Sequence, residues 1–298
     1  MFFQSLPNSP IGEADIVILP VPWENTVSYK SGTAAAPEAI LDATDQLEYY
    51  EEDVGWSPMQ HLKVCVTPKV IASVAAFHAT LAKITVTLPS NNLLIALGGE
   101  HSITPTLIKA RMPQGTVIFL DAHGDLRKSY QGSELSHACP AYRILQQGHF
   151  LIMAGIRSLF EDEIERIVSS DKISLFMDRN LRKPEHWQQF LEQLKNLRGQ
   201  VWLSIDMDVF NPALVAGVGT PQPGGLDWYQ VVEILEIVFF NKNIKLQGMD
   251  IVELVPEPSR VSEMTAAKLI QKAISFWGKA HNFAQKPLTG SQTLVNYD

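Results

Sequence analysis

Cysteine is scarce in this chain, which has two cysteines, Cys65 and Cys139, among its 298 residues. Two cysteines so far apart in sequence are too few for a disulfide framework or a zinc knuckle, and we expect Cys65 to lie in the core. No apolar run approaches the roughly 20 residues that a bilayer-spanning helix needs. The N-terminal letters MFFQ lack the basic region of a secretory signal. We therefore expect a cytoplasmic protein with no membrane partner.

Basic charge is in deficit as well, since 24 Lys and Arg stand against 32 Asp and Glu, for a net charge of −8. This balance, without any basic block, argues against a nucleic-acid partner and favours a cationic small molecule. The chain also lacks repeats, low-complexity tracts and Gly/Ser-rich linkers that would mark a domain boundary. Because 46% of the residues are hydrophobic, a large core can form, and we expect a single domain over residues 1–298.

Short apolar runs recur along the chain, each apolar almost continuously, which is typical of strands covered on both faces. They are Ile16–Leu19, Leu93–Leu97, Val117–Leu120, Leu151–Ala154, Ile173–Phe176, Val201–Ile205 and Leu246–Val252. Helical spacing of apolar residues between them predicts helices around Val70–Leu81, Trp187–Leu194 and Trp228–Phe239, the last with Asp227 as N-cap. This alternation predicts an α/β fold with a mainly parallel sheet between helix layers.

Polar side chains follow four of these runs at the point where each predicted strand ends. Ligand sites of parallel sheets lie beyond the carboxyl ends of the strands, so we expect the four segments to converge. The segments are Gly98-Gly99-Glu100-His101-Ser102, Asp121-Ala122-His123-Gly124-Asp125, Ser204-Ile205-Asp206-Met207-Asp208 and Glu253.

Alternate residues of an extended strand share a face, which predicts a cluster of four carboxylates and two imidazoles. Its members are His101, Asp121, His123, Asp125, Asp206 and Asp208. Uncompensated, the carboxylates would repel one another, and divalent cations remove that repulsion. Two cations about 3.5–4 Å apart could share the ligands. An oxygen and imidazole set without thiolate suits Mn²⁺ better than structural zinc, and Ni²⁺ or Co²⁺ could replace it.

These motifs resemble the three signatures of the ureohydrolase family, which includes arginases and agmatinases. The resemblance extends to the segments Ser28–Gly32, Ala154–Ser158, Gly217–Pro221 and Asp250–Glu253. It implies a single three-layer αβα domain with an eight-stranded, mainly parallel sheet. It also implies two Mn²⁺ per subunit and a homo-oligomer, a trimer or hexamer.

The resemblance also implies a ligand scheme and a reaction. One metal would be bound by His101, Asp121, Asp125 and Asp206, and the other by Asp121, His123, Asp206 and Asp208, so that Asp121 and Asp206 bridge. Water activated by the two cations would attack a guanidinium carbon and release urea and an amine. Glu253 would pair with the guanidinium, Asp125 would pass a proton to the leaving amine, and His137 would relay protons.

The segment after the second motif, Arg127–His137, lacks the Asn- and Ser/Gly-rich loop with which arginases bind an α-amino acid. Like Glu100 in the first motif, it resembles agmatinases, so agmatine, cleaved to putrescine and urea for polyamine biosynthesis, is the expected substrate. Tyr130 and Glu134 are candidates for contacting its distal end. Departures from the family pattern leave aminopropylagmatine, guanidinobutyrate, arginine and formiminoglutamate as alternatives. The departures are Asn211, Val215, Ala216, Val218, Val255 and Ser259.

Three alternative functions would use the same residues differently. A single-zinc deacetylase of related fold would need Asp121, His123 and Asp206 as ligands. It would have no need of the other three members of the cluster, which are His101, Asp125 and Asp208. An amidine hydrolase with a cysteine nucleophile could use Cys139 with His137 as base, which leaves the acidic cluster unexplained. A non-catalytic metal-binding oligomer would hold metal without releasing urea.

Overall fold

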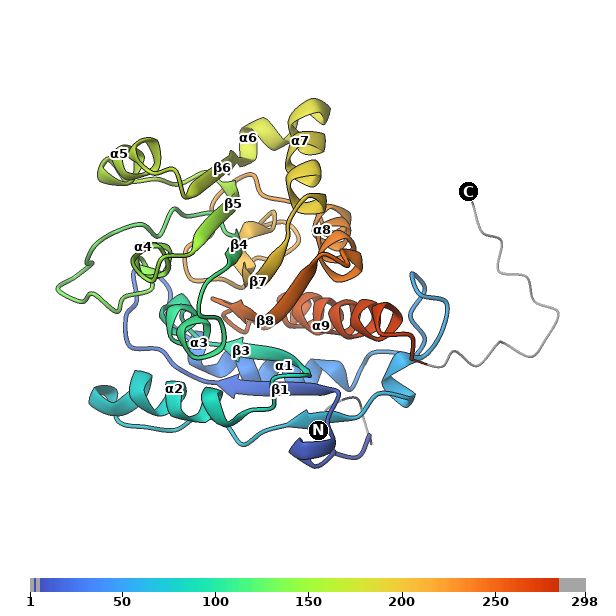
Figure 1. Cartoon of the computed structure of the whole chain (residues 1–298). Coiled ribbons are helices and arrows are strands. Elements are labelled where there is room, and N and C mark those ends of the chain that lie inside the picture. The colour runs from blue at the N-terminus through green and yellow to red at the C-terminus, as the bar shows by residue number, and fades with distance from the viewer. Residues whose placement is uncertain (1–2, 4–5, 284–298) are drawn as a thin grey trace.

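The computed structural model describes residue 3 and residues 6–283 of the chain (Figure 1). Its centre is one sheet of eight parallel strands in the order β2-β1-β3-β8-β7-β4-β5-β6. The strands are β1 (Ile16–Val21), β2 (Val64–Val66), β3 (Leu93–Gly98), β4 (Thr116–Leu120), β5 (Phe150–Ile156), β6 (Ile173–Met177), β7 (Gly199–Asp206) and β8 (Ile244–Val252). The expected α/β fold with a parallel eight-stranded sheet is confirmed.

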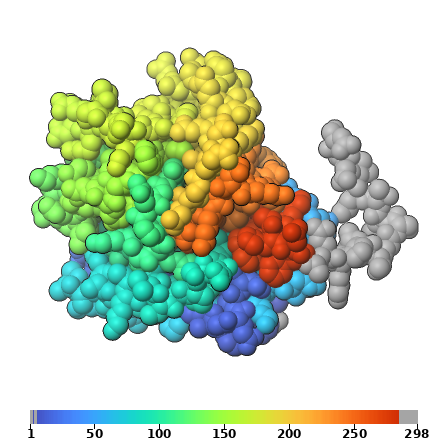
Figure 2. All heavy atoms as spheres, viewed as in Figure 1, coloured from blue at the N-terminus to red at the C-terminus, as the bar shows by residue number. Residues whose placement is uncertain are grey.

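Helices cover both faces of the sheet, which gives the three layers. Their bounds are α1 (Ala36–Thr44), α2 (Phe77–Thr87), α3 (Thr104–Arg111), α4 (Pro140–Gln146), α5 (Glu161–Ser169), α6 (Asp178–Leu181), α7 (Pro184–Lys195), α8 (Trp228–Phe240) and α9 (Val261–Ala280). On one face α1, α7, α8 and α9 pack against the sheet, and on the other α2, α3 and α4 do so. Figure 2 shows the atoms of α8 and α9 side by side on the surface.

Strands with buried residues on both faces explain the continuous apolar runs. In β1, Ile16 and Ile18 belong to the core under α1 and α9, whereas Val17 and Leu19 belong to the core under α2 and α3. Successive side chains of a strand point to opposite faces, so a strand between two helix layers needs apolar residues at every position.

One sequence prediction was wrong, and one strand was missed. The helical spacing of Val70, Val74, Phe77 and Leu81 is not one helix, because α2 begins at Phe77 after a 3₁₀ turn over Val74–Ala76. Val70 instead donates its backbone N–H to the carbonyl of Pro20 beside the sheet. Strand β2 was not predicted from the apolar pattern, since it has three residues and lies at the sheet edge.

Other local predictions are confirmed. Asp227 caps α8, and its carboxylate accepts a hydrogen bond of 2.9 Å from the backbone of Gln230, whose side chain binds back to the Asp227 N–H. Cys65 is buried. Within the described part of the chain, no helix combines the length and apolar character needed to cross a bilayer.

Candidate metal centre and pocket

Four neighbouring strands at the centre of the sheet, β3, β8, β7 and β4, carry the acidic and imidazole residues at their carboxyl ends. Leu97 of β3 pairs with Ile251 of β8, which pairs with Ile205 of β7, which pairs with Leu120 of β4. This register places the residue that follows each strand on the same edge. The segments that the sequence predicted to converge therefore do so.

Glycine lets the first of these segments turn sharply after β3. A Cβ atom on Gly99 would lie 1.9 Å from the carbonyl oxygen of Trp23, so another side chain does not fit. Glu100 then donates its backbone N–H to that same carbonyl at 2.8 Å. This close backbone approach at Gly99 directs His101 toward the strand ends.

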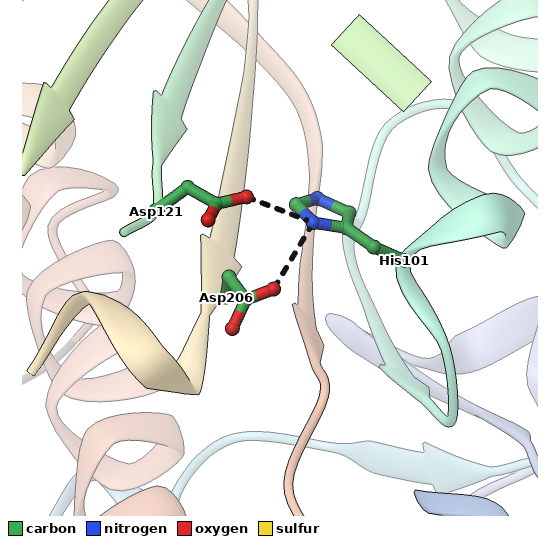
Figure 3. Close-up of side chains that lie close together, drawn as sticks. All are labelled: His101, Asp121 and Asp206. Atoms are coloured by element: carbon green, nitrogen blue, oxygen red, sulfur yellow. Dashed lines mark ion pairs between the residues drawn. The ribbon is translucent and has the colours of Figure 1, made fainter. Parts of the chain in front are cut away.

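The first ligand group surrounds the Nδ1 atom of His101. The Oδ2 atoms of Asp121 and Asp206 each lie 3.2 Å from it (Figure 3), and Asp125 Oδ2 lies at 3.6 Å. His101 and Asp121 are fully buried, and Asp206 is nearly so. Three carboxylates thus aim at one imidazole nitrogen.

The second ligand group surrounds the Nδ1 atom of His123. Asp208 Oδ2 lies 2.8 Å from it and Asp121 Oδ1 lies 3.7 Å away. Asp121 therefore presents one oxygen to each group, as a bridging ligand must. Asp206 presents Oδ2 to the first group, while its Oδ1 accepts the backbone N–H of Asp208 at 2.8 Å.

Unpartnered buried atoms show that the residues fit metal ions. Within the described residues, His101 Nδ1 and Asp121 Oδ2 are buried without a hydrogen-bond partner. The opposite nitrogen, His101 Nε2, lies 2.9 Å from Ser204 Oγ, and Ser204 donates to Asp250 at 2.6 Å. Because the single hydroxyl hydrogen of Ser204 goes to Asp250, we assign the imidazole hydrogen to Nε2. In the neutral ring Nδ1 then has the lone pair, which faces the carboxylates, and this is the arrangement that metal-binding histidines adopt.

Charge in the cluster also favours cations. Burial by itself would lower the pKa of both imidazoles, but the neighbouring carboxylates raise the pKa of His101 to about 9 and that of His123 to about 12. Burial, and then the charges of their neighbours, raise the pKa of Asp125 and Asp206 well above the usual range. The site therefore draws in positive charge, which divalent ions can supply.

Two of the site residues adopt left-handed backbone conformations, with φ of 49° at Asp125 and 62° at Glu253. Such conformations are unfavourable for residues other than glycine, and strain of this kind clusters at functional sites. Glu253 Oε1 accepts the backbone N–H of His101 at 2.6 Å. Burial first, and nearby carboxylates in addition, raise the pKa of Glu253 to about 8.

A pocket of about 180 Å³ opens above the ligand groups. Its floor includes His123, Asp125, Asp206, Asp208 and Glu253, and its wall includes Ser28, Arg127, Tyr130, His137, Phe160 and Thr220. Glu134, a predicted contact of the distal end of the substrate, does not line this pocket. It is largely exposed and pairs with Arg143 at 3.4 Å.

The departures from the family pattern also lie away from this pocket. Among the residues that line it, none of Asn211, Val215, Ala216, Val218, Val255 and Ser259 occurs. Val215, Val218 and Val255 are buried in the core, and the Asn211 side chain accepts the backbone N–H of Ala213 at 2.9 Å. None of the six departures therefore contacts the space in which a substrate would lie.

His137 and Cys139 have different surroundings. The His137 ring lies between the hydroxyls of Thr26, 2.8 Å from Nδ1, and Ser28, 2.7 Å from Nε2. Burial lowers the pKa of His137 to about 4, so the ring is neutral near pH 7. Cys139 is buried, and burial raises the pKa of its thiol to about 11, which disfavours the nucleophilic thiolate of the cysteine hydrolase alternative.

Sequence reasoning missed several residues that support the site. Ser204 and Asp250 lie inside quoted motifs, and their polar side chains within apolar strands were a usable signal. Arg127 and Phe160 line the pocket together: the Arg127 guanidinium lies 4.2 Å from the centre of the Phe160 ring and 5.0 Å from that of Tyr130. Nothing in the pattern around Phe160 or Thr26 distinguished them from ordinary loop residues.

Comparison with known proteins decides the family. The model of the arginase family matches residues 14–275. The chain belongs to the arginase family. It is therefore a ureohydrolase-type hydrolase of amidino C–N bonds, a family whose members carry a binuclear metal centre, and it contains both candidate ligand groups for one.

Relatives of this arginase-family chain include an N(1)-aminopropylagmatine ureohydrolase of Synechocystis, 34% identical over 294 residues that cover 94% of each chain. An agmatinase of Pyrococcus horikoshii is 36% identical over 275 residues, 90% of this chain and 94% of the relative. Among solved structures, agmatine ureohydrolase of Thermoplasma volcanium superposes with a TM-score of 0.82 at 30% identity, covering 92% of this chain and 93% of the other.

Proposed function

We propose that this arginase-family hydrolase cleaves the guanidino group of agmatine to give putrescine and urea, a step of polyamine biosynthesis. One observation carries the proposal: residues of both ligand groups line the same pocket as Glu253, namely Asp206 of the first group and His123 and Asp208 of the second. A carboxylate beside a two-cation centre suits a substrate that is planar and always positively charged. The similarity to agmatinases supports agmatine in particular.

We propose Mn²⁺ as the metal, because the ligands are carboxylates and imidazoles without a thiolate. His101, Asp121, Asp125 and Asp206 would hold one ion, and Asp121, His123, Asp206 and Asp208 the other. Two divalent ions held there would supply an activated water by lowering its pKa toward neutrality. The protein's task is then to place the guanidinium carbon beside that water.

The side chains around the pocket divide the remaining work. Glu253 accepts hydrogen bonds from the guanidinium and orients its plane. Asp125, on the pocket floor, receives a proton and passes it to the leaving amine, and His137, neutral near pH 7, relays protons between pocket and solvent. Tyr130 lies on the wall, where it can contact the alkyl chain of the substrate.

A second candidate substrate is N(1)-aminopropylagmatine. It is supported by the relatives of Synechocystis and Thermus thermophilus, which carry that name at 34% and 36% identity. The two candidates share the guanidinium and differ in the length of the cationic tail. The residues that bind the guanidinium would be the same for both.

One observation favours a substrate whose far end carries a negative charge. Arg127 lies on the pocket wall between the rings of Tyr130 and Phe160. Among the ion pairs of the described residues, none joins Arg127 to a carboxylate. A fixed cation there attracts a carboxylate and repels an ammonium group. Guanidinobutyrate, which ends in a carboxylate, is the candidate that this charge favours.

The test is urea release by the Mn²⁺-loaded protein from agmatine, N(1)-aminopropylagmatine, guanidinobutyrate, arginine and formiminoglutamate. We expect the highest kcat/KM for agmatine. Preference for guanidinobutyrate would overturn agmatine as the substrate and would agree with the positive charge of Arg127 on the pocket wall. Release of urea from none of the five would overturn the proposal and favour the non-catalytic alternative.

A further inference from the structure

A chain of hydrogen bonds joins Glu100 to His137 through the hydroxyl of Thr26. Thr26 Oγ1 lies 3.0 Å from Glu100 Oε2, 2.8 Å from His137 Nδ1 and 3.0 Å from the backbone nitrogen of His137. Glu100 lies 74 positions after Thr26 in the sequence, and His137 lies 111 positions after it. The contact therefore ties the N-terminal loop after β1 to the loop that carries His137.

The number of hydrogens available determines the direction of these bonds. A threonine hydroxyl has one hydrogen to donate and two lone pairs, and Thr26 has three partners. The backbone N–H of His137 can only donate to it. Of the two remaining partners, Glu100 and the His137 ring, one must receive the hydroxyl hydrogen and the other must supply a hydrogen.

Glu100 is the acceptor. Its Oε2 atom already accepts the backbone N–H groups of Asn25 at 2.9 Å and Thr26 at 2.6 Å, and its Oε1 atom accepts the hydroxyl of Ser102. An oxygen that receives two N–H donors has no room to donate as well. The Thr26 hydrogen therefore goes to Glu100, and His137 Nδ1 must carry a hydrogen and donate it to Thr26.

We propose that Thr26, held by Glu100, is a positioning residue that keeps His137 in the tautomer with hydrogen on Nδ1. The proposal rests on the proposed function, in which His137 relays protons. The Nε2 atom then carries a lone pair that accepts the Ser28 hydroxyl at 2.7 Å on the pocket wall. Ser28 has one hydrogen, which goes to this short contact, and Tyr130 Oη, 3.4 Å from Ser28 Oγ, then donates to Ser28. In the opposite tautomer Nε2 would offer an N–H and could not take up a proton.

The decisive variant is Thr26→Val, which keeps the shape of the side chain and removes the hydroxyl. Thr26→Ser restores the hydroxyl and should rescue the effect. Thr33→Val is a matched control, because Thr33 also donates to a glutamate, Glu24 Oε2, at 2.9 Å, and that carboxylate also accepts two backbone N–H groups. Thr33 has no contact with His137 in this network.

Two measurements are read together. Long-range ¹⁵N spectra of the histidine rings, recorded near pH 7 on metal-free protein and assigned with His137→Asn, report the tautomer independently of activity. We expect hydrogen on Nδ1 in the wild type, in Thr26→Ser and in Thr33→Val, and a mixed or reversed tautomer in Thr26→Val. With Mn²⁺ bound, kcat for urea release should fall about tenfold or more in Thr26→Val with a smaller change in KM.

A wild-type ring with hydrogen on Nε2, or a tautomer that Thr26→Val leaves unchanged, would overturn this proposal. If Thr26→Val does not fold, Thr26→Ala removes the same hydroxyl and is read in the same way. Failure of the proposed function looks different: the wild type then releases no urea from any guanidine, while the ring spectra still report the tautomer.

Discussion

The Nδ1 atom of His101 and the Oδ2 atom of Asp121 lie 3.2 Å apart, yet within the described structure neither has a hydrogen-bond partner. In the neutral ring that metal binding requires, both buried atoms offer lone pairs and would be unfavourable neighbours without a cation between them. The other oxygen of Asp121 faces His123. Asp121 thus connects the two ligand groups, and its loss should affect both metals.

We predict that Asp121→Asn lowers the bound Mn²⁺ well below the content of Asp208→Asn, because Asp208 belongs to one ligand group and Asp121 to both. Metal content per chain after dialysis, measured by inductively coupled plasma mass spectrometry, checks this. Asp227→Asn is the control, since asparagine also caps helices and Asp227 lies outside the site. Equal metal loss in the Asp121 and Asp208 variants would contradict the bridging role.

Glu253→Gln should reduce kcat/KM for agmatine by about 10- to 100-fold, the equivalent of losing a charged hydrogen bond of about 1.5–3 kcal/mol. Metal content should stay near that of the wild type, because Glu253 is assigned to the guanidinium and not to the ions. Glu192→Gln, at an exposed position of α7, is the matched control. A variant with unchanged kcat/KM would remove Glu253 from substrate binding.

Cys139→Ser should retain activity within about twofold. The thiol is buried, and burial raises its pKa to about 11, so little thiolate exists near pH 7. Steady-state urea release, together with titration of free thiols in the wild type, tests this. Abolished turnover in a variant that folds and binds metal normally would revive the cysteine hydrolase alternative.

Lys272 of α9 makes a buried ion cluster with the acidic segment Glu51, Glu52 and Asp53. Its ammonium group lies among these carboxylates, so we assign no metal to them, although their spacing would allow one. Lys272→Met leaves the buried Glu51 carboxylate with weaker compensation. It should lower the free energy of unfolding by about 3–5 kcal/mol.

Urea denaturation measures this loss of stability. Lys195→Met removes an exposed pair with Glu192 and should cost no more than about 1 kcal/mol. If the free energy of unfolding falls by the same small amount in both variants, Lys272 does not anchor the segment of Glu51, Glu52 and Asp53 to α9.

The same cluster predicts a pH dependence of definite sign. Burial by itself would raise the pKa of Glu52. The hydrogen bond from Lys272, together with the other groups around the Glu52 carboxylate, outweighs the effect of burial and lowers this pKa to about 2. The folded state therefore binds this proton less readily than the unfolded state, where the pKa is near 4.5. The stabilisation is present above pH 4.5 and is lost as the pH falls toward 2. Unfolding curves should show a shallower acid dependence for Lys272→Met in that window.

The part of the site that could be predicted from sequence is local. Asp121, His123 and Asp125 follow an apolar strand at alternate positions, and Asp206 and Asp208 repeat that spacing, so their convergence depends only on strand geometry and a parallel sheet. The rest depends on long-range packing. No local pattern places β8 between β3 and β7, and that order is what brings Glu253 beside His101.

The misplaced predictions have the same cause. Val70 and Val74 have helical spacing with Phe77, but Val70 is buried beside β1 while Val74 is exposed, so tertiary contacts overrode the pattern. Glu134 was predicted from the sequence to contact the distal end of the cationic substrate. Its loop folds back so that Glu134 pairs with Arg143, an arrangement that depends on α4 and not on neighbours in sequence.

The most direct test of the two-cation account is a titration of metal-free protein with Mn²⁺, in which bound metal and urea release from agmatine are followed together. We predict that urea release reaches its plateau when about two ions are bound per chain. A plateau at a single bound ion, or two bound ions without urea release, would contradict the account.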